Sequence, residues 1–112
     1  MILIIGGAYQ GKLTWAVRTY GLKKIELCDL EDGFATGKRC YYHLEALTKR
    51  GEDVPTFPED AIVIAREVGC GVVPMEAEER AWREHHGVVL QELAKRAERV
   101  VRVFCGIGEA LK

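Results

Sequence analysis

Three features that would each assign a protein to a particular class are missing from this sequence. Its apolar runs fall far short of the ~20 residues that span a bilayer. The apolar start, Met1 to Ile5, has no basic lead and is too short for a signal peptide, so we expect a cytoplasmic protein with no membrane partner. Basic residues number 16 and acidic residues 17, and the net charge of −1 argues against a nucleic-acid partner held by bulk charge.

Closely spaced cysteine pairs are also missing. The four cysteines, Cys28, Cys40, Cys70 and Cys105, stand too far apart in the sequence to form a C-x-x-C motif. A zinc site or a redox-active pair of the usual spacing is therefore not indicated. Because cytosolic thiols stay reduced, we expect all four to be small apolar side chains in or near the core.

The composition is that of an ordinary globular protein. With 112 residues, 48% hydrophobic and 29% charged, we expect one domain, residues 1–112, with a substantial core. Apolar runs predict strands at 2–5, 24–28, 61–65 and 100–105, and the segments between them predict helices at 13–20, 39–50 and 76–99. Such alternation is typical of a small three-layer α/β domain, here with about four mostly parallel strands flanked by helices. We expect the strand order 2-3-1-4, with the first strand in the interior.

The longest predicted helix, residues 76–99, has apolar side chains at intervals of three and four residues. This spacing predicts one apolar stripe along the helix. The residues of the stripe are Ala81, Trp82, His85, Val88, Val89, Leu93 and Ala97. For the adjacent pair His85-His86 we expect packing or solvent exposure, without a catalytic role.

The first predicted strand leads directly into a glycine-rich motif. Residues Gly6-Gly7-Ala8-Tyr9-Gln10-Gly11-Lys12 fit the pattern G-x-x-x-x-G-K, and Leu13 and Thr14 follow in the predicted helix. Between a strand and a helix, this pattern is typical of a phosphate-binding P-loop. Its glycines let backbone N–H groups curve around a polyphosphate, and the helix N-terminus adds partial positive charge. We therefore expect a fold like that of P-loop NTPases, ATP or GTP as ligand, and Lys12 at the β- and γ-phosphates.

The motif departs from its usual form at its last position. Ser or Thr there supplies a hydroxyl to Mg²⁺, whereas this chain has Leu13. Thr14 is one residue further on, rotated by about 100° around the helix axis, and is expected to point elsewhere. We therefore expect Mg²⁺ to be weakly held, with Asp29 or Glu67 as the candidate acidic ligands.

Two alternative interpretations of the same residues stay open. Gly6 to Lys12 is also compatible with a tight strand-to-helix turn that binds no phosphate. Gly6, Ala8 and Gly11 approximate the dinucleotide fingerprint G-x-G-x-x-G, and Asp29 lies where a ribose-binding acid is expected. Against a dinucleotide site, Ala8 replaces the middle glycine and Lys12 has no role in that motif.

A second glycine-rich turn follows the third predicted strand. It runs from Arg66 to Pro74 with the sequence R-E-V-G-C-G-V-V-P. Glu67 is expected at the edge of the sheet where open α/β folds bind ligands. It could hold Mg²⁺ through water or position a nucleophile; the alternative is that it caps the turn or pairs with a neighbouring Lys or Arg.

The two turns, the long charged helix and the closing V-V-R-V-F-C-G-I-G together resemble one family. The opening M-I-L-I-I-G-G-A-x-x-G-K and the run E-V-G-x-G-V-V-P are similar to the bifunctional adenosylcobinamide kinase/adenosylcobinamide-phosphate guanylyltransferases of cobalamin biosynthesis. The resemblance covers roughly residues 1–20 and 61–112. It implies a P-loop α/β fold, a nucleotide, a cobinamide-type substrate and a homotrimer. It matches Gly6, Gly7, Ala8, Gly11 and Lys12 to the family's phosphate loop, and Glu67, Val68, Gly69, Gly71 and Pro74 to its second turn.

The same resemblance implies a second reaction, in which GMP is transferred through a covalent intermediate on a histidine. Family members are longer, and the segment with that histidine is expected between Gly33 and Ala61, where this chain has no matching residues. The histidine found there is His43, in Y-Y-H-L-E-A-L. This context resembles a different helix of the family, so we do not assign the nucleophile's role to His43.

Two functions therefore stay open. The first is a kinase-type enzyme in which Lys12 holds the phosphates, Glu67 or Asp29 serves the metal, and cobinamide or another small alcohol accepts the phosphoryl group. The second is a shortened relative that binds a nucleotide or phosphate without turnover, in regulation or as a subunit. Leu13 and the missing segment favour the second, so we expect phosphoryl transfer to be impaired and guanylyl transfer to be lost.

Overall fold

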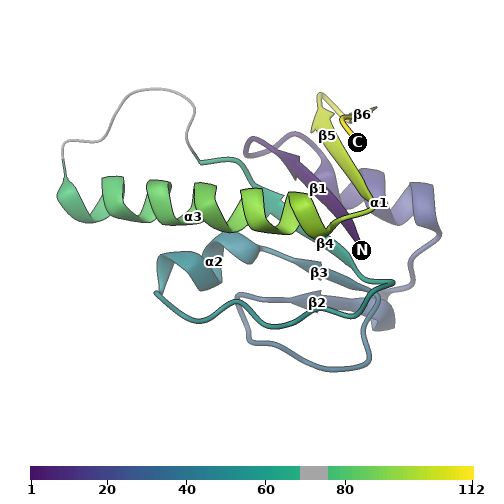
Figure 1. Cartoon of the computed structure of the whole chain (residues 1–112). Helices are drawn as coiled ribbons and strands as arrows, with labels where there is room; N and C mark the ends of the chain where they lie inside the picture. Colours follow the sequence, from purple (N-terminus) through teal and green to yellow (C-terminus); the bar gives the residue numbers. More distant parts are fainter. Residues whose placement is uncertain (69–75) are drawn as a thin grey trace.

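A six-stranded, mostly parallel sheet forms the centre of the molecule (Figure 1). The computed structural model describes residues 1–68 and 76–112. Across the sheet the order is β2-β3-β4-β1-β5-β6; the first four pairings are parallel and β5–β6 is antiparallel. The elements in chain order are β1 (Ile2–Gly6), α1 (Lys12–Tyr20), the 3₁₀ helix η1 (Lys24–Glu26), β2 (Leu27–Asp29), β3 (Cys40–Tyr42), α2 (Leu44–Lys49), β4 (Ile62–Arg66), α3 (Ala77–Arg96), β5 (Arg99–Phe104) and β6 (Ile107–Ala110).

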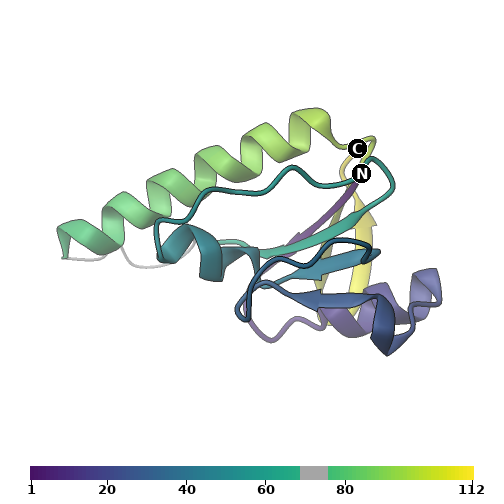
Figure 2. The same ribbon diagram turned by 90° about the horizontal axis from the view of Figure 1, so that it is seen from below.

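The sheet is the middle of three layers, with α1 on one face and α2 and α3 on the other (Figure 2). Successive side chains of β1 point to opposite faces of the sheet. Leu3 packs with Leu44 and Leu93 under α2 and α3, whereas Ile4 packs with Ala16 of α1. A strand that is apolar on both faces belongs in the interior of a parallel sheet, and β1 does lie between β4 and β5. The predicted order of the four expected strands is confirmed.

The predicted helix at 39–50 is wrong in its first part. Cys40–Tyr42 form β3, which enters the sheet between β2 and β4, and α2 begins only at Leu44. Cys40 and Tyr41 are both fully buried, on opposite faces of the sheet, and an interior strand provides such an environment. His43 makes the turn between strand and helix with a positive φ of 63°.

Both ends of the predicted strand pattern also need correction. Residues 24–26 form a 3₁₀ turn, so β2 is shorter than expected. After β5 the chain makes a two-residue turn, Cys105-Gly106, whose φ angles of 51° and 74° suit a tight hairpin, and returns as β6. Cys105 is exposed there, so the expectation of a core position is wrong for it; Cys28 and Cys40 are buried, and Cys70 lies outside the described residues.

The long helix α3 is confirmed, but its predicted buried stripe is correct only in part: Leu93 and Ala97 are buried, whereas Ala81, His85 and Val88 are exposed. His86, Leu93 and Ala97 are 4% exposed or less, whereas Val88 is 55% exposed. His85, placed in the stripe by its spacing, is exposed, and His86 packs against the sheet in its place. The hydrophobic pattern does not predict this, because the buried imidazole satisfies its polar atoms through partners on other elements.

Across residues 1–68 and 76–112, no helix has the length and apolar character required to cross a membrane.

Candidate phosphate-binding site

A cavity of about 290 Å³ opens near the carboxyl ends of β1 and β3. The helix that follows β1 lies on one face of the sheet, and the helix that follows β4 lies on the opposite face. Between such strands the loops diverge, which is where open α/β sheets bind ligands. The residues that line the cavity are Ala8, Tyr9, Gln10, Gly11, Lys12, Leu13, Thr14, Tyr42, His43, Glu45 and Ile64.

Glycine is required at two positions of the loop that forms one wall. A Cβ on Gly6 would lie 2.5 Å from the backbone oxygen of Val103, so a side chain there would push β1 and β5 apart. Gly11 precedes α1 with a φ of +86°, in the left-handed region that glycine enters without steric cost. Gly6 thus keeps the strand ends close, and Gly11 lets the chain turn into the helix.

Gln10 fastens this loop to the β5–β6 hairpin. Its side-chain oxygen Oε1 accepts a hydrogen bond of 2.8 Å from the backbone N–H of Cys105, and its carbonyl oxygen accepts one of 2.8 Å from Gly106. The loop is therefore held by a hairpin from the opposite end of the chain. The motif gave no signal for this contact, because its pattern leaves the position of Gln10 unspecified.

Lys12 carries the positive charge of the cavity's loop wall. Its Nζ donates a 2.7 Å hydrogen bond to the carbonyl oxygen of Gly7. Loss of solvent on burial lowers the pKa of Lys12; Arg66 lowers it further, while Glu45 and Glu67 act in the opposite direction. A partly desolvated ammonium group with three donors gains stability from an anion, and a phosphate placed in the cavity would supply one.

The first turn of α1 lacks a hydroxyl at the position where a P-loop binds its metal. Leu13 is half-buried and packs against the apolar cluster on the α1 face of the sheet. Thr14 is exposed, and both residues border the cavity. An apolar side chain at position 13 offers no oxygen to Mg²⁺.

The opposite side of the cavity is supported by a hydrogen-bond network around Arg66. Glu45, in the first turn of α2, accepts a 2.9 Å bond from the backbone N–H of Arg66. The Nε2 of buried His86 lies 2.7 Å from the carbonyl oxygen of the same residue, and its Nδ1 lies 2.8 Å from the hydroxyl of Thr48. Since a carbonyl can only accept, Nε2 carries a proton. The Thr48 hydroxyl also lies 3.1 Å from the carbonyl oxygen of Glu45, so its single proton serves either that oxygen or Nδ1. Burial lowers the pKa of His86, which favours the neutral ring.

Glu67 directly follows β4, as predicted, and its backbone N–H donates a 2.9 Å bond to the carbonyl of Gly6. Its carboxylate Oε2 lies 3.4 Å from Nε of Arg102. The expected pairing of Glu67 with a neighbouring basic residue is thus present. Val68 is half-buried beside it; the remaining predicted residues of this turn, Gly69, Gly71 and Pro74, lie outside the described residues.

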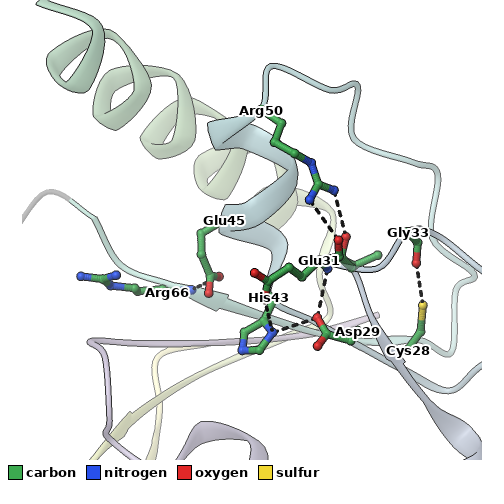
Figure 3. Close-up of polar contacts among 9 residues, drawn as sticks. Cys28, Asp29, Glu31, Gly33, His43, Glu45, Arg50 and Arg66 are labelled. Carbon is green, nitrogen blue, oxygen red and sulfur yellow. Dashed lines mark hydrogen bonds and ion pairs between the residues drawn. The ribbon is translucent and has the colours of Figure 1, made fainter.

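Asp29, the other acidic candidate, ends β2 and meets His43 (Figure 3). Its Oδ1 lies 2.8 Å from His43 Nδ1, and Glu31 Oε2 lies 3.8 Å from the same nitrogen. In the part of the chain that the structure describes, these three residues form the one group of donor atoms close enough to share a metal ion, and Glu67 is not a member. The pairing of Asp29 with His43 was not predicted, since the two residues meet only when β2 and β3 pair.

The fold and the glycine-rich loop define a doubly wound α/β protein with a candidate anion site at the point where its loops diverge. A comparison with protein families matches residues 31–111 to the family described as cobinamide kinase / cobinamide phosphate guanyltransferase. The match covers most of the chain, and the chain belongs to this family. It includes residues 33–61, which the motif resemblance did not cover, and it begins after the phosphate loop. No curated protein sequence matches the chain.

Proposed function

We propose that this chain binds the triphosphate of ATP or GTP on the loop from Gly6 to Thr14. The observation that carries the proposal is the position of Lys12: its partly desolvated ammonium group borders a cavity at the strand-to-helix turn of the central strand. Backbone N–H groups of the loop and the N-terminus of α1 would hold the phosphates there. Gln10, bonded to the hairpin, would keep the loop in shape before the nucleotide arrives.

Membership of the family supports a phosphoryl transfer to a cobinamide-type small molecule as the reaction of this site. We propose that this transfer is impaired. A bound Mg²⁺ would supply charge neutralisation that matters most in the transition state, and the side chain of Leu13 would offer it no ligand. Glu67, one of the two acidic candidates for the metal, is paired with Arg102. Binding would survive, because the backbone donors and Lys12 remain; turnover would fall below the ~1–100 s⁻¹ of ordinary kinases.

We further propose that guanylyl transfer is lost. The sequence contains three histidines. His86 is fully buried and hydrogen-bonded at both ring nitrogens, and His85 does not line the cavity. His43 does line it, with one ring nitrogen beside Asp29, but its sequence context is not that of the family's nucleophile.

A thermal-shift panel tests nucleotide binding. ATP, GTP, NAD and cobinamide are each added to the native chain with and without Mg²⁺, and Lys12→Ala is run beside it. A ligand that binds the folded state raises the melting temperature. We expect ATP or GTP to do so without Mg²⁺, and we expect the shift to shrink in Lys12→Ala. A shift with NAD alone would favour the dinucleotide alternative, and no shift with any nucleotide would contradict the proposal.

The non-catalytic alternative is distinguished by the reaction itself. If nucleotide binds but no phosphoryl transfer to cobinamide is detected at all, the chain acts as a nucleotide-binding regulator or subunit. The single domain over residues 1–112 and the homotrimer implied by the resemblance are likewise proposals. Light scattering on the purified chain measures the second directly.

A further inference from the structure

We propose that Asp29, Glu31 and His43 bind a divalent cation of the first transition row, such as Mn²⁺ or Zn²⁺. Asp29 ends β2, Glu31 follows in the next loop, and His43 lies between β3 and α2. One donor atom from each residue lies within 4.8 Å of the other two, at an exposed position beside the phosphate cavity (Figure 3).

The spacing of the donors suits one shared ion. A metal held at about 2.0–2.2 Å by nitrogen and oxygen ligands places neighbouring donors roughly 3 Å apart. The two distances from His43 Nδ1, 2.8 Å to Asp29 and 3.8 Å to Glu31, bracket that value. Glu31 is the ligand that would move, and its side chain is 66% exposed and therefore has room to do so.

The backbone of this loop is fixed before a cation binds. The guanidinium group of Arg50 donates 3.0 Å and 3.2 Å bonds to the carbonyl oxygens of Glu31 and Leu30, and the N–H of Glu31 donates to Asp29 Oδ1 at 3.0 Å. Figure 3 shows the two Arg50 bonds reaching the loop from the side of α2. Arg50 thus orders the chain that presents the carboxylates, and its own ion pair is with Glu52.

The backbone of His43 has a conformation that is unusual for a residue with a side chain. Its φ of 63° lies in the left-handed region, which costs a residue with a side chain about 1–2 kcal/mol. This conformation turns the chain from β3 into α2 while the ring faces Asp29 on the neighbouring strand. Two carboxylates brought together beside one imidazole concentrate negative charge that a bound cation would neutralise.

The donor types select the kind of ion. Mg²⁺ and Ca²⁺ prefer oxygen ligands throughout, whereas imidazole favours transition metals. Three protein donors leave further coordination positions for water or for another ligand. Since His43 also lines the cavity with Lys12, the ion would lie at the wall opposite the phosphate loop. The inference goes beyond the proposed nucleotide binding and does not depend on it, because the cation is measured without nucleotide.

The test uses Mn²⁺ and the full, untagged chain. Mn²⁺ binds thiolates poorly, so the exposed Cys105 does not compete, and the paramagnetic resonance signal of free Mn²⁺ reports how much is bound. We expect one Mn²⁺ per chain, displaced by Zn²⁺ and resistant to excess Mg²⁺. His43→Ala and Asp29→Asn should each weaken binding at least tenfold, and His85→Ala, the matched exposed histidine, should not.

Glu31→Gln guards against a variant that fails to fold, since Glu31 is exposed and the substitution keeps its size. Circular dichroism checks each variant before titration. The proposal is overturned if the native chain binds no Mn²⁺, or if folded His43→Ala or Glu31→Gln binds it as tightly as the native chain. Mn²⁺ binding without any nucleotide binding would contradict the proposed function and leave this site standing.

Discussion

The two walls of the cavity are built in different ways. One wall is a single stretch of chain, Ala8 to Thr14, that follows the central strand. The other is assembled from four residues on three elements and one turn: Tyr42 at the end of β3, His43 in the turn that follows, Glu45 of α2 and Ile64 of β4. A contiguous wall is visible in the sequence as a pattern of glycine and lysine. An assembled wall is not, because its residues meet only when the strands pair.

The two walls offer different chemical groups and therefore suit different ligands. The contiguous wall offers backbone donors and one ammonium group, which suit any polyphosphate but do not select a metal. The assembled wall offers the Glu45 carboxylate and the His43 imidazole, and the carboxylates of Asp29 and Glu31 lie beside that imidazole. Leu13 offers no oxygen to a metal at the first wall, whereas Asp29, Glu31 and His43 bring three potential metal ligands together beside the second.

The largest expected effect comes from Gly6, the last residue of β1, which lies just before the contiguous wall. A Cβ at this position meets the backbone of Val103, which cannot yield without moving β5. We expect Gly6→Ala to lower the free energy of unfolding by about 1–3 kcal/mol and to weaken triphosphate binding. Urea denaturation measures the first effect. Gly7→Ala is the matched control, because the nearest atom to its Cβ would be Gln10 Cγ at 3.8 Å, an ordinary contact; equal losses in the two variants would contradict this account.

The second prediction concerns the pH dependence of stability and His86, which supports the assembled wall through its contact with Arg66. Burial lowers the pKa of His86 below the 6.5 of an ordinary histidine, so the unfolded chain takes up a proton before the folded one does. Stability should therefore fall as the pH drops below 6.5, by up to about 1.4 kcal/mol per pH unit until the folded protein also protonates. We expect His86→Gln to remove this part of the pH dependence, measured by urea denaturation between pH 5 and 7.5. His85→Gln should retain it.

The sequence predicts the parts of the molecule that one stretch of chain forms, and it fails for the parts that are assembled from several stretches. Continuous apolar runs and a local motif were sufficient for β1, β4, β5, the order of these strands with β2, and the loop with Lys12. The sequence wrongly predicts helix for Cys40–Tyr42, because the strand character of this stretch depends on burial between two neighbouring strands. For His85-His86 the sequence leaves packing and solvent exposure open, because the hydrogen bonds that let the His86 imidazole be buried come from α2 and β4. Asp29 was noted as an acid, but its partners Glu31 and His43 depend on the pairing of β2 and β3.

A smaller effect is expected at Leu13, on the Mg²⁺ dependence of nucleotide affinity. Nucleotide affinity of the native chain should depend little on Mg²⁺, and Leu13→Ser, which restores a hydroxyl, should make it about tenfold tighter with Mg²⁺ than without. Calorimetric titration of ATP with and without the metal measures the ratio. Leu13→Ala removes the same apolar contacts without adding an oxygen. If it gains the same Mg²⁺ dependence, the hydroxyl is not the cause.

The smallest expected effect is an absence of labelling. GTP with a radioactive α-phosphate should leave no acid-labile label on the native chain, because we propose that guanylyl transfer is lost and that His43 does not act as the nucleophile. His43 is the histidine that borders the cavity, so any label is to be sought there. Gel autoradiography before and after acid treatment, with His43→Ala beside the native chain, gives the answer. A stable label that His43→Ala abolishes would show that guanylyl transfer is retained.

The central claim is that the contiguous wall binds a triphosphate through Lys12. Calorimetric titration of ATP and of GTP into the native chain, Lys12→Ala and the exposed control Lys24→Ala tests it most directly. Hydrogen bonds to charged groups contribute about 1.5–3 kcal/mol, so Lys12→Ala should weaken binding by at least ~1 kcal/mol while Lys24→Ala matches the native chain. Equal affinities in the native chain and Lys12→Ala would contradict the claim.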